Sequence, residues 1–227
     1  MKKDDILAKG AILQRDGETY AIAARLAAGI FDVETGKRIA EIAEKYGVEM
    51  LKITGDGRLA LIGIAQEDID AVYADMGVKA QPGTALCQQY IKACPGSTFC
   101  QRGQRDTIAM AREMDQRLYP YPKISSKVKI GIAGCFNSCA EPAIKDIGLV
   151  GLPKGWVLMV GGAGGKDPMI AETVARNLSD EEALEAVEKI MKYYRGASMS
   201  PRTRNQRLGV ILKKEGLDRL RRIIGFE

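Results

Sequence analysis

The segment KVKIGIAGCFNSCAE, residues 127–141, joins a strand pattern to two closely spaced cysteines. Lysine alternates with apolar residues at its start, which predicts a β-strand with Lys127 and Lys129 on one face. The strand leads into Cys135 and Cys139, which have a C-x3-C spacing. Thiols that follow directly on a strand predict a metal or cluster site at its end.

A second cysteine pair, Cys94 and Cys100, lies upstream with a C-x5-C spacing. Four thiolates from two loops suit either zinc or an iron–sulfur cluster. The wide second spacing and small neighbours such as Gly134, which let backbone N–H groups approach inorganic sulfide, favour a cluster. Zinc and unligated core thiols remain open alternatives. Cys87 lies outside both pairs and is expected to be a buried apolar thiol.

The composition limits the class of protein. The chain has 227 residues, of which 46% are hydrophobic and 28% are charged, as in a globular protein. It contains no histidine, which excludes His-dependent triads, His-ligated haem and the usual catalytic zinc sites. No apolar run is long enough to span a membrane and no secretory leader is visible, so we expect a cytoplasmic location. Five cysteines in that compartment argue against a disulfide framework.

The net charge of +5 is concentrated at the C-terminus. Residues 201–227 hold eight lysines and arginines against three acids, so this tail carries the whole excess. A basic tail contacts an acidic partner, or it is simply a solvated helical face. We expect neither a membrane nor a nucleic acid as a partner.

Apolar periodicity predicts an α+β fold with three parts. The first, residues 1–79, follows the order strand, helix, strand, strand, helix of a ferredoxin-like split unit. Its expected elements are a strand at 20–26, a helix at 37–46, strands at 49–54 and 58–64, and a helix at 67–76. An α/β domain spans residues 80–200, and a basic helical tail spans 201–227. Their expected elements are a helix at 103–118, strands at 127–132, 147–150 and 156–160, a helix from Ser179 to about Tyr194, and tail helices broken at Gly216.

These features resemble the sirohaem-dependent sulfite and nitrite reductases. Residues 127–141 are close to the cluster signature of that family. Residues 51–64, LKITGDGRLALIGI, resemble a strand pair that usually carries Thr-Thr-Arg-Gln, and residues 25–29 resemble the start of the ferredoxin-like half-domain. The resemblance covers roughly residues 18–200. Larger family members contain two such units in tandem, whereas this chain has one.

The resemblance implies that residues 80–200 bind a sirohaem and a [4Fe-4S] cluster. The implied cluster ligands are Cys94, Cys100, Cys135 and Cys139. Cys139 also bridges the cluster to the sirohaem iron. The implied reaction is the six-electron reduction of sulfite to sulfide, with electrons from an external donor such as a ferredoxin.

The substrate and the haem carboxylates are anions, so the family's site is lined by cations. The resemblance places Arg25, Lys127 and Lys129 at anion-binding, catalytic positions. The arginine that usually follows Thr-Thr is Asp56 here, and Arg58 is expected to substitute for it.

Three further residues are expected to bind the cofactors. Arg102 follows Gln101, which occupies a position where the family commonly has arginine. Gly134 and Asn137 lie in or beside the second cysteine pair, where a backbone N–H and an amide can reach cluster sulfur; capping of the next turn is the plainer role for Asn137.

Other functions stay open on the same scaffold. Nitrite reduction to ammonia is one, and a non-catalytic electron-transfer or sirohaem-binding protein, favoured by Asp56 and Gln101, is another. A zinc-stabilised binding module is the weakest. Because one unit is present instead of two, we expect a homo-oligomer, in which cations of one chain cover the haem of the other.

Overall fold

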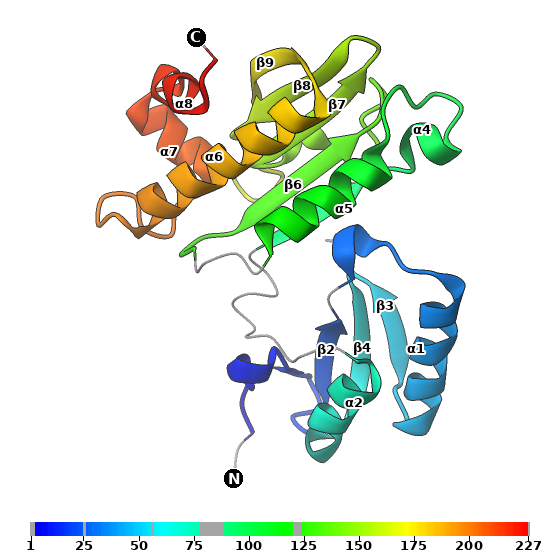
Figure 1. Ribbon diagram of the computed structural model, residues 1–227. Helices are drawn as coiled ribbons and strands as arrows, with labels where there is room; N and C mark the ends of the chain where they lie inside the picture. The colour runs from blue at the N-terminus through cyan, green and yellow to red at the C-terminus, as the bar shows by residue number, and fades with distance from the viewer. Residues whose placement is uncertain (1–2, 25, 56, 78–88, 120–123, 227) are drawn as a thin grey trace. The chain divides into compact units, whose positions relative to one another are not determined.

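The computed structural model describes residues 3–24, 26–55, 57–77, 89–119 and 124–226 (Figure 1). The predictions for Arg25, Asp56 and Cys87 therefore lie outside the described residues. The chain divides into two compact units, residues 1–87 and 88–227. Within the described ranges, no helix is both long enough and apolar enough to cross a bilayer.

The first unit is a four-stranded antiparallel sheet with the order β1-β2-β4-β3. Its elements are η1 (Leu7–Lys9), β1 (Ile12–Leu13), β2 (Tyr20–Ala24), η2 (Ala27–Gly29), α1 (Val33–Lys45), β3 (Met50–Ile53), β4 (Leu59–Ile64), η3 (Gln66–Asp68) and α2 (Ile69–Asp75). The expected strand-helix-strand-strand-helix order is confirmed. Helix α1 begins four residues earlier than predicted because the Asp32 carboxylate accepts a hydrogen bond from the Thr35 N–H and caps it.

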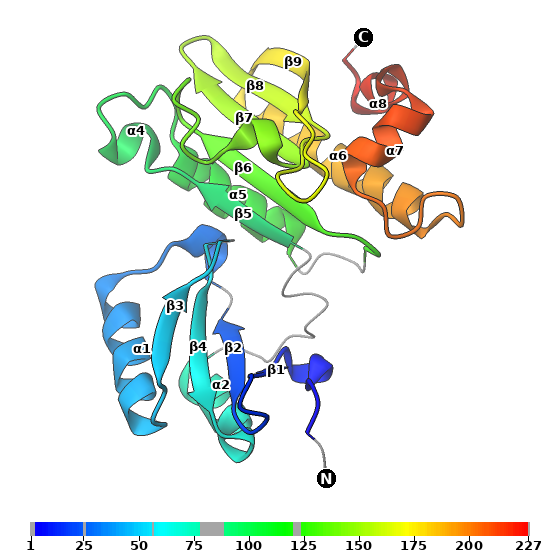
Figure 2. The same ribbon diagram turned by 180° about the vertical axis from the view of Figure 1, so that it is seen from behind.

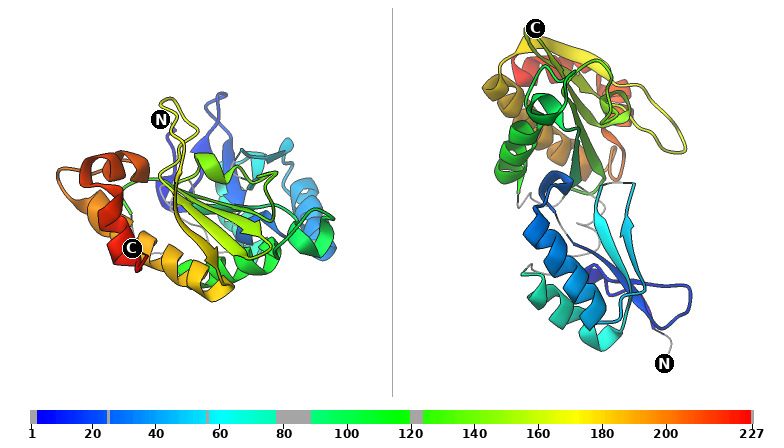
Figure 3. Two further views of the ribbon diagram at one scale, coloured as in Figure 1. Left: turned by 90° about the horizontal axis from the view of Figure 1, so that it is seen from above. Right: turned by 90° about the vertical axis from the view of Figure 1, so that its right-hand side faces the viewer.

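Both helices of this unit pack on the same face of its sheet (Figure 3). The apolar residues Ile42 on α1, Leu61 on β4 and Val72 on α2 are buried together. The outer strand β3 is exposed along its whole length, including Met50 and Ile53. An exposed apolar edge strand is a site at which further chains can pair.

The second unit has a five-stranded sheet with the order β5-β6-β7-β8-β9. Strands β5, β6 and β7 are parallel, and β8 and β9 continue the sheet antiparallel. The elements are β5 (Gln89–Ala93), α4 (Gly96–Phe99), α5 (Thr107–Leu118), β6 (Val128–Ala133), η4 (Pro142–Ile144), β7 (Ile147–Leu152), β8 (Gly155–Val160), β9 (Glu172–Leu178), α6 (Asp180–Met199), α7 (Leu208–Glu215) and α8 (Leu217–Ile224).

The two faces of this sheet are covered differently. Helices α5 and α6 lie over one face (Figure 1), and the short turn η4 packs against β6, β7 and β8 on the other (Figure 2). The approach of the η4 segment is close. A Cβ atom on Gly131 would lie 2.7 Å from the Ala140 carbonyl oxygen, so only glycine admits this packing.

Several boundaries differ from the sequence prediction. Helix α5 begins at Thr107 instead of 103, because the Asp106 carboxylate accepts hydrogen bonds from two N–H groups of its first turn. The predicted helix from Ser179 is confirmed: a capping box of Ser179 and Glu182 starts α6, which continues to Met199 instead of ending near Tyr194. Strands β5 and β9 were not predicted. Strand β5 pairs with β6, which is distant in sequence, and β9 pairs with β8 across a long loop.

The C-terminal residues form α7 and α8, with the predicted break at Gly216. Their apolar residues Leu208, Ile211, Leu220 and Ile224 are buried. Helix α8 packs against α6. The tail is therefore an integral part of the second unit.

Candidate functional site

Cys94 and Cys135 follow directly on two neighbouring parallel strands. In the register of β5 and β6, Ala93 pairs with Ile132, and the Cys94 N–H donates to the Ile132 carbonyl (N···O 3.1 Å). Because parallel strands end at the same side of a sheet, both cysteines emerge at one edge. We call the loops that carry Cys94, Cys100, Cys135 and Cys139 the cysteine edge.

Gly134 connects the two loops of the cysteine edge. Its N–H donates to the Cys94 sulfur (N···S 3.1 Å), and its carbonyl accepts from the Gln104 N–H (2.7 Å). A Cβ atom on Gly134 would lie 3.0 Å from the Gly96 Cα atom, so a side chain there would push the loops apart. The backbone donor that the sequence predicted at Gly134 is thus directed at the sulfur atom of Cys94.

Thr107 is a site residue that sequence reasoning missed. Its hydroxyl donates to the Cys94 carbonyl and lies 3.9 Å from the Cys94 sulfur, and its side chain is fully buried. Thr107 is also the first residue of the 12-residue helix α5, whose N-terminus therefore adjoins the thiol. The capping residue Asp106 just before it signals the start of the helix in the sequence, but not the contact with Cys94.

The other two thiols lie on turns. Cys100 ends α4, and its N–H donates to the Gly96 carbonyl (2.8 Å). Cys139 is exposed. Ser138, just before it, and Glu141, two residues after it, have left-handed φ angles of 52° and 56°. All four of these cysteines are free thiols.

The structure does not by itself gather the predicted ligands into one group. In the part of the chain that it describes, no three His, Cys, Asp or Glu side chains are placed to hold a metal ion. The Gly134 N–H that is directed at the Cys94 sulfur is the kind of backbone donor that surrounds iron–sulfur clusters.

Arg102 and Asn137, two predicted cofactor-binding residues, are exposed on the cysteine edge. The Arg102 carbonyl oxygen accepts a hydrogen bond from the Gln104 side-chain amide (3.3 Å). The Asn137 amide makes no hydrogen bond to the residues that the structure describes. Both positions are compatible with a ligand at this edge, and capping by Asn137 is not seen.

Lys127 and Lys129 lie at the opposite end of β6. The predicted face is confirmed, since Lys129 is half-buried between the buried Val128 and Ile130. Its ammonium lies 5.3 Å from the centroid of the Tyr90 ring. Lys129 and the end of the strand at Ala133 are separated by about 13 Å of extended chain. The structure therefore does not bring these lysines to the cysteine edge.

A buried ion pair holds this lysine end of β6. Asp146 is fully buried and accepts from the Lys129 N–H (2.8 Å) and from Nε and Nη2 of Arg207 (2.9 and 2.6 Å). Burial raises the pKa of Asp146, and the Arg207 guanidinium opposes that rise. The Tyr194 hydroxyl lies 3.0 Å from the carbonyl oxygens of Lys127 and Gln206. The C-terminal segment thus fixes the start of the strand.

Both units of the chain match known protein families. Residues 84–227 match the "Nitrite and sulphite reductase 4Fe-4S domain", and residues 12–78 match the "Nitrite/Sulfite reductase ferredoxin-like half domain". The chain belongs to the nitrite and sulphite reductase family. It is therefore an oxidoreductase of that family, whose cofactors are sirohaem and a [4Fe-4S] cluster.

Individual relatives differ in how much of their length is matched. The assimilatory-type sulfite reductase of Nitratidesulfovibrio vulgaris is 35% identical over 216 residues, which cover 95% of this chain and 97% of that protein. The nitrite reductase [NAD(P)H] of Bacillus subtilis is 30% identical over 185 residues, 82% of this chain but 23% of that protein.

Two solved structures share the fold. The NirA protein of Mycobacterium tuberculosis superposes with a TM-score of 0.79 at 17% identity, covering 91% of this chain and 39% of that one. Dissimilatory sulfite reductase I superposes with a TM-score of 0.77 at 14% identity, covering 92% and 69%. At these identities the similarity concerns the fold alone, and it confirms the α+β architecture.

In this reductase, Arg58 belongs to the first unit. It precedes β4, where its N–H donates to the Thr54 hydroxyl (3.1 Å) and its carbonyl accepts from the Thr54 N–H (2.8 Å). These bonds close the predicted turn between β3 and β4. They fix the backbone of Arg58 and leave its anion-binding role a prediction.

Proposed function

We propose that this protein reduces sulfite to sulfide, using sirohaem, a [4Fe-4S] cluster and an external electron donor. The observation that carries the proposal is the match along almost the whole length of an assimilatory-type sulfite reductase. The nitrite reductases that resemble this chain match over less than a quarter of their own length.

We propose Cys94, Cys100, Cys135 and Cys139 as the ligands of the cluster. The Gly134 N–H donates to the Cys94 sulfur, and the first residue of α5 contacts Cys94 through its hydroxyl. The exposed Cys139 is the proposed bridge to the sirohaem iron. When bound, the coupled cofactors relay single electrons to the substrate.

The proposed anion-binding residues fall into two groups by position. Arg102, on the cysteine edge, is proposed to bind a cofactor carboxylate near the cluster, together with donors from Gly134 and Asn137. Lys127 and Lys129 lie one strand length away, which fits carboxylates at the periphery of a large macrocycle better than an anion at its iron. Arg25 and Arg58 are proposed as ligands of sulfite from the family resemblance.

The reaction is tested on anaerobically purified protein with reduced viologen as donor. We expect sirohaem bands in the optical spectrum, oxidation of the dye on addition of sulfite, and one sulfide for every six electrons. A spectrum without sirohaem bands after reconstitution would refute the proposal. Bands without turnover would replace it with an electron-transfer or accessory role.

Nitrite is the second candidate substrate, because nitrite reductases also match this chain. The same assay compares kcat/KM for sulfite and nitrite and measures ammonium as the product. We expect the larger kcat/KM for sulfite. A larger value for nitrite would transfer the proposal to that anion.

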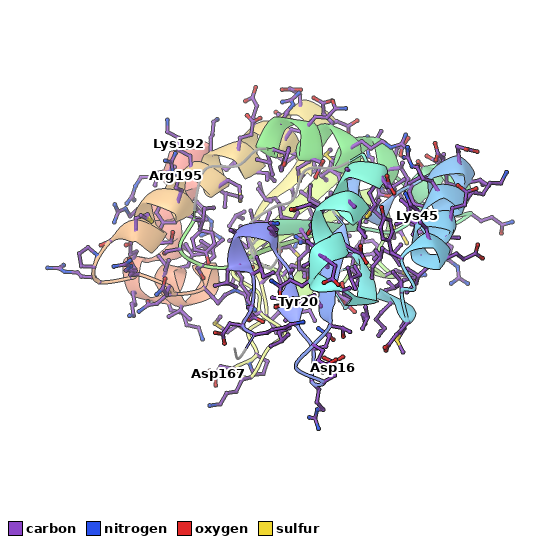
Figure 4. All side chains as sticks on the ribbon, turned by 90° about the horizontal axis from the view of Figure 1, so that it is seen from below. Asp16, Tyr20, Lys45, Asp167, Lys192 and Arg195 are labelled. Atoms are coloured by element: carbon purple, nitrogen blue, oxygen red, sulfur yellow. The ribbon has the colours of Figure 1, made fainter. Side chains whose placement is uncertain are left out.

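We propose that the electron donor is a small acidic protein such as a ferredoxin. Exposed cations near the C-terminus support an acidic partner: Lys192 and Arg195 on α6 (Figure 4), joined by those of the tail. Part of the tail's charge is neutralised locally, as in the Arg221–Asp218 pair. We expect the KM for a ferredoxin to rise with salt; a salt-independent KM would exclude this docking mode.

We also propose that the protein self-associates. The exposed apolar edge strand β3 supports this, since Met50, Leu51 and Ile53 are available to a second copy. Light scattering on the holoprotein should give a mass at least twice that of the chain. A monomer that retains full activity would contradict the proposal.

A further inference from the structure

A carboxylate held between two lysines links the two loops of the cysteine edge. Oε2 of Glu141 lies 2.8 Å from Nζ of Lys145 and 3.1 Å from Nζ of Lys92. Glu141 follows Cys139 by two residues, and Lys92 precedes Cys94 by two. The Lys145 side chain is 7% exposed, so removing the Glu141 carboxylate would leave a buried ammonium without this ion pair.

The backbone of Glu141 gives a second reason to assign it a role. Its φ of 56° is in the left-handed region, which side chains other than glycine, asparagine and aspartate rarely adopt. A glycine at this position would remove the strain. The side chain that is present is instead held by Lys92 on β5 and by Lys145 just after η4, and this contact is available to compensate for the backbone conformation.

The turn that contains Cys139 is fixed on each side. The Glu141 N–H donates to the Ser138 carbonyl (2.7 Å), and the Ser138 N–H donates to the Cys135 carbonyl (3.1 Å). These bonds hold the turn together internally. The contact of Glu141 with Lys92 is the side-chain link between this turn and the strand that carries Cys94.

We infer that Glu141 is a positioning residue for Cys139, acting through Lys92 and Lys145. It holds the Cys139 turn at a fixed place relative to Cys94 and so keeps the proposed bridging thiolate in register with the other three ligands. This inference rests on the proposed ligand set. Supporting residues next to metal ligands commonly change metal affinity by about 10- to 100-fold when they are replaced.

The test compares Glu141→Gln and Lys92→Met with the parent protein. Glu141→Gln keeps the size of the side chain and removes its charge, and Lys92→Met removes one lysine. The measurements are the rate of iron release to a chelator and the EPR spectrum of the reduced cluster. We expect release about tenfold faster in both variants and broadened EPR signals, because the turn samples several positions.

Glu215→Gln is the matched control. Glu215 also accepts from two groups, Arg219 (3.0 Å) and the Tyr193 hydroxyl (2.8 Å), but it lies on α7, outside the cysteine loops. It should release iron at the parental rate. The inference would be overturned if Glu141→Gln and the parent released iron at equal rates. It would also be overturned if the two test variants shifted the cluster potential in opposite directions without faster iron release, since that is a purely electrostatic effect.

Two further variants separate this inference from the proposed ligand set. Glu141→Gly relieves the backbone strain but removes the carboxylate, and we expect it to release iron as fast as Glu141→Gln. Parental release by Glu141→Gly would show that the backbone alone positions the turn. Cys139→Ala should lose the cluster and the sirohaem bands; full retention of both would refute the ligand set itself.

Discussion

The two ends of strand β6 are held in place by different means. At the cysteine edge, backbone atoms approach each other so closely that Gly131 and Gly134 have no room for a side chain. At the lysine end, a buried pair joins Asp146 to Arg207, 61 residues further along the chain. The cysteine edge is therefore specified by its own short loops, whereas the lysine end depends on the C-terminal segment. Substitutions at the cysteine edge should therefore mainly reduce cofactor binding, whereas substitutions at the lysine end should mainly reduce the free energy of unfolding.

The largest effect is expected at the cysteine edge. Cys94→Ala removes the thiol that accepts the Gly134 N–H and that adjoins the start of α5. We expect loss of the cluster and of the sirohaem bands, with turnover reduced to background. Iron content and the optical spectrum measure this. Retention of a full complement of iron would show that Cys94 is not a ligand.

The next effect is expected at the lysine end. Arg207→Met leaves the fully buried Asp146 without its cation and should lower the free energy of unfolding by about 3 kcal/mol. Because burial raises the pKa of Asp146 and Arg207 opposes that rise, the variant's carboxyl protonates at a higher pH than the parent's.

The pH dependence has a definite sign. Ionised Asp146 is penalised in the folded variant, and protonation relieves that penalty, so the difference in stability should shrink as the pH falls toward the range where carboxyls protonate. Urea unfolding at several pH values measures it. A difference that grows on acidification would show that Asp146 is not the group responsible.

Gly131→Ala should have a smaller effect on stability and a larger one on the cofactor. The new Cβ would lie 2.7 Å from the Ala140 carbonyl oxygen, so the turn after Cys139 must move. We expect a loss of about 2 kcal/mol in the free energy of unfolding, together with a lower content of bound iron. Unchanged iron content would show that the turn tolerates this displacement.

The smallest effect is expected at an exposed ion pair away from both ends. Glu181 accepts two hydrogen bonds of 2.7 Å from Arg117, and these bonds lower the pKa of Glu181. Glu181→Gln should leave the urea midpoint and the iron content at parental values, because solvent-exposed pairs contribute little. A clear loss of stability would mean that this pair supports the packing of α5 on α6.

The cysteine edge was predictable from sequence to a large extent, and the lysine end was not. Cysteine spacing and Gly134 are local signals, and the alternation of residues 127–132 identified the correct face of β6. The separation of the lysines from Cys135 also follows from their places on one strand. By contrast, the pairing of Asp146 with Arg207 and the contact of Thr107 with Cys94 depend on tertiary structure, which periodicity does not report.

The pairing of β5 with β6 sets an order of events during biosynthesis. Cys94 and Cys135 meet only after the chain has passed through α5 and returned in parallel, so the four thiols are not together in a partly synthesised chain. Non-local strand pairing of this kind forms late, because the closure of the intervening segment must come first. The first unit has its own core and none of these four thiols, so the proposed cluster ligands all belong to the second unit. Assembly of the proposed cluster site therefore requires the pairing of β5 with β6.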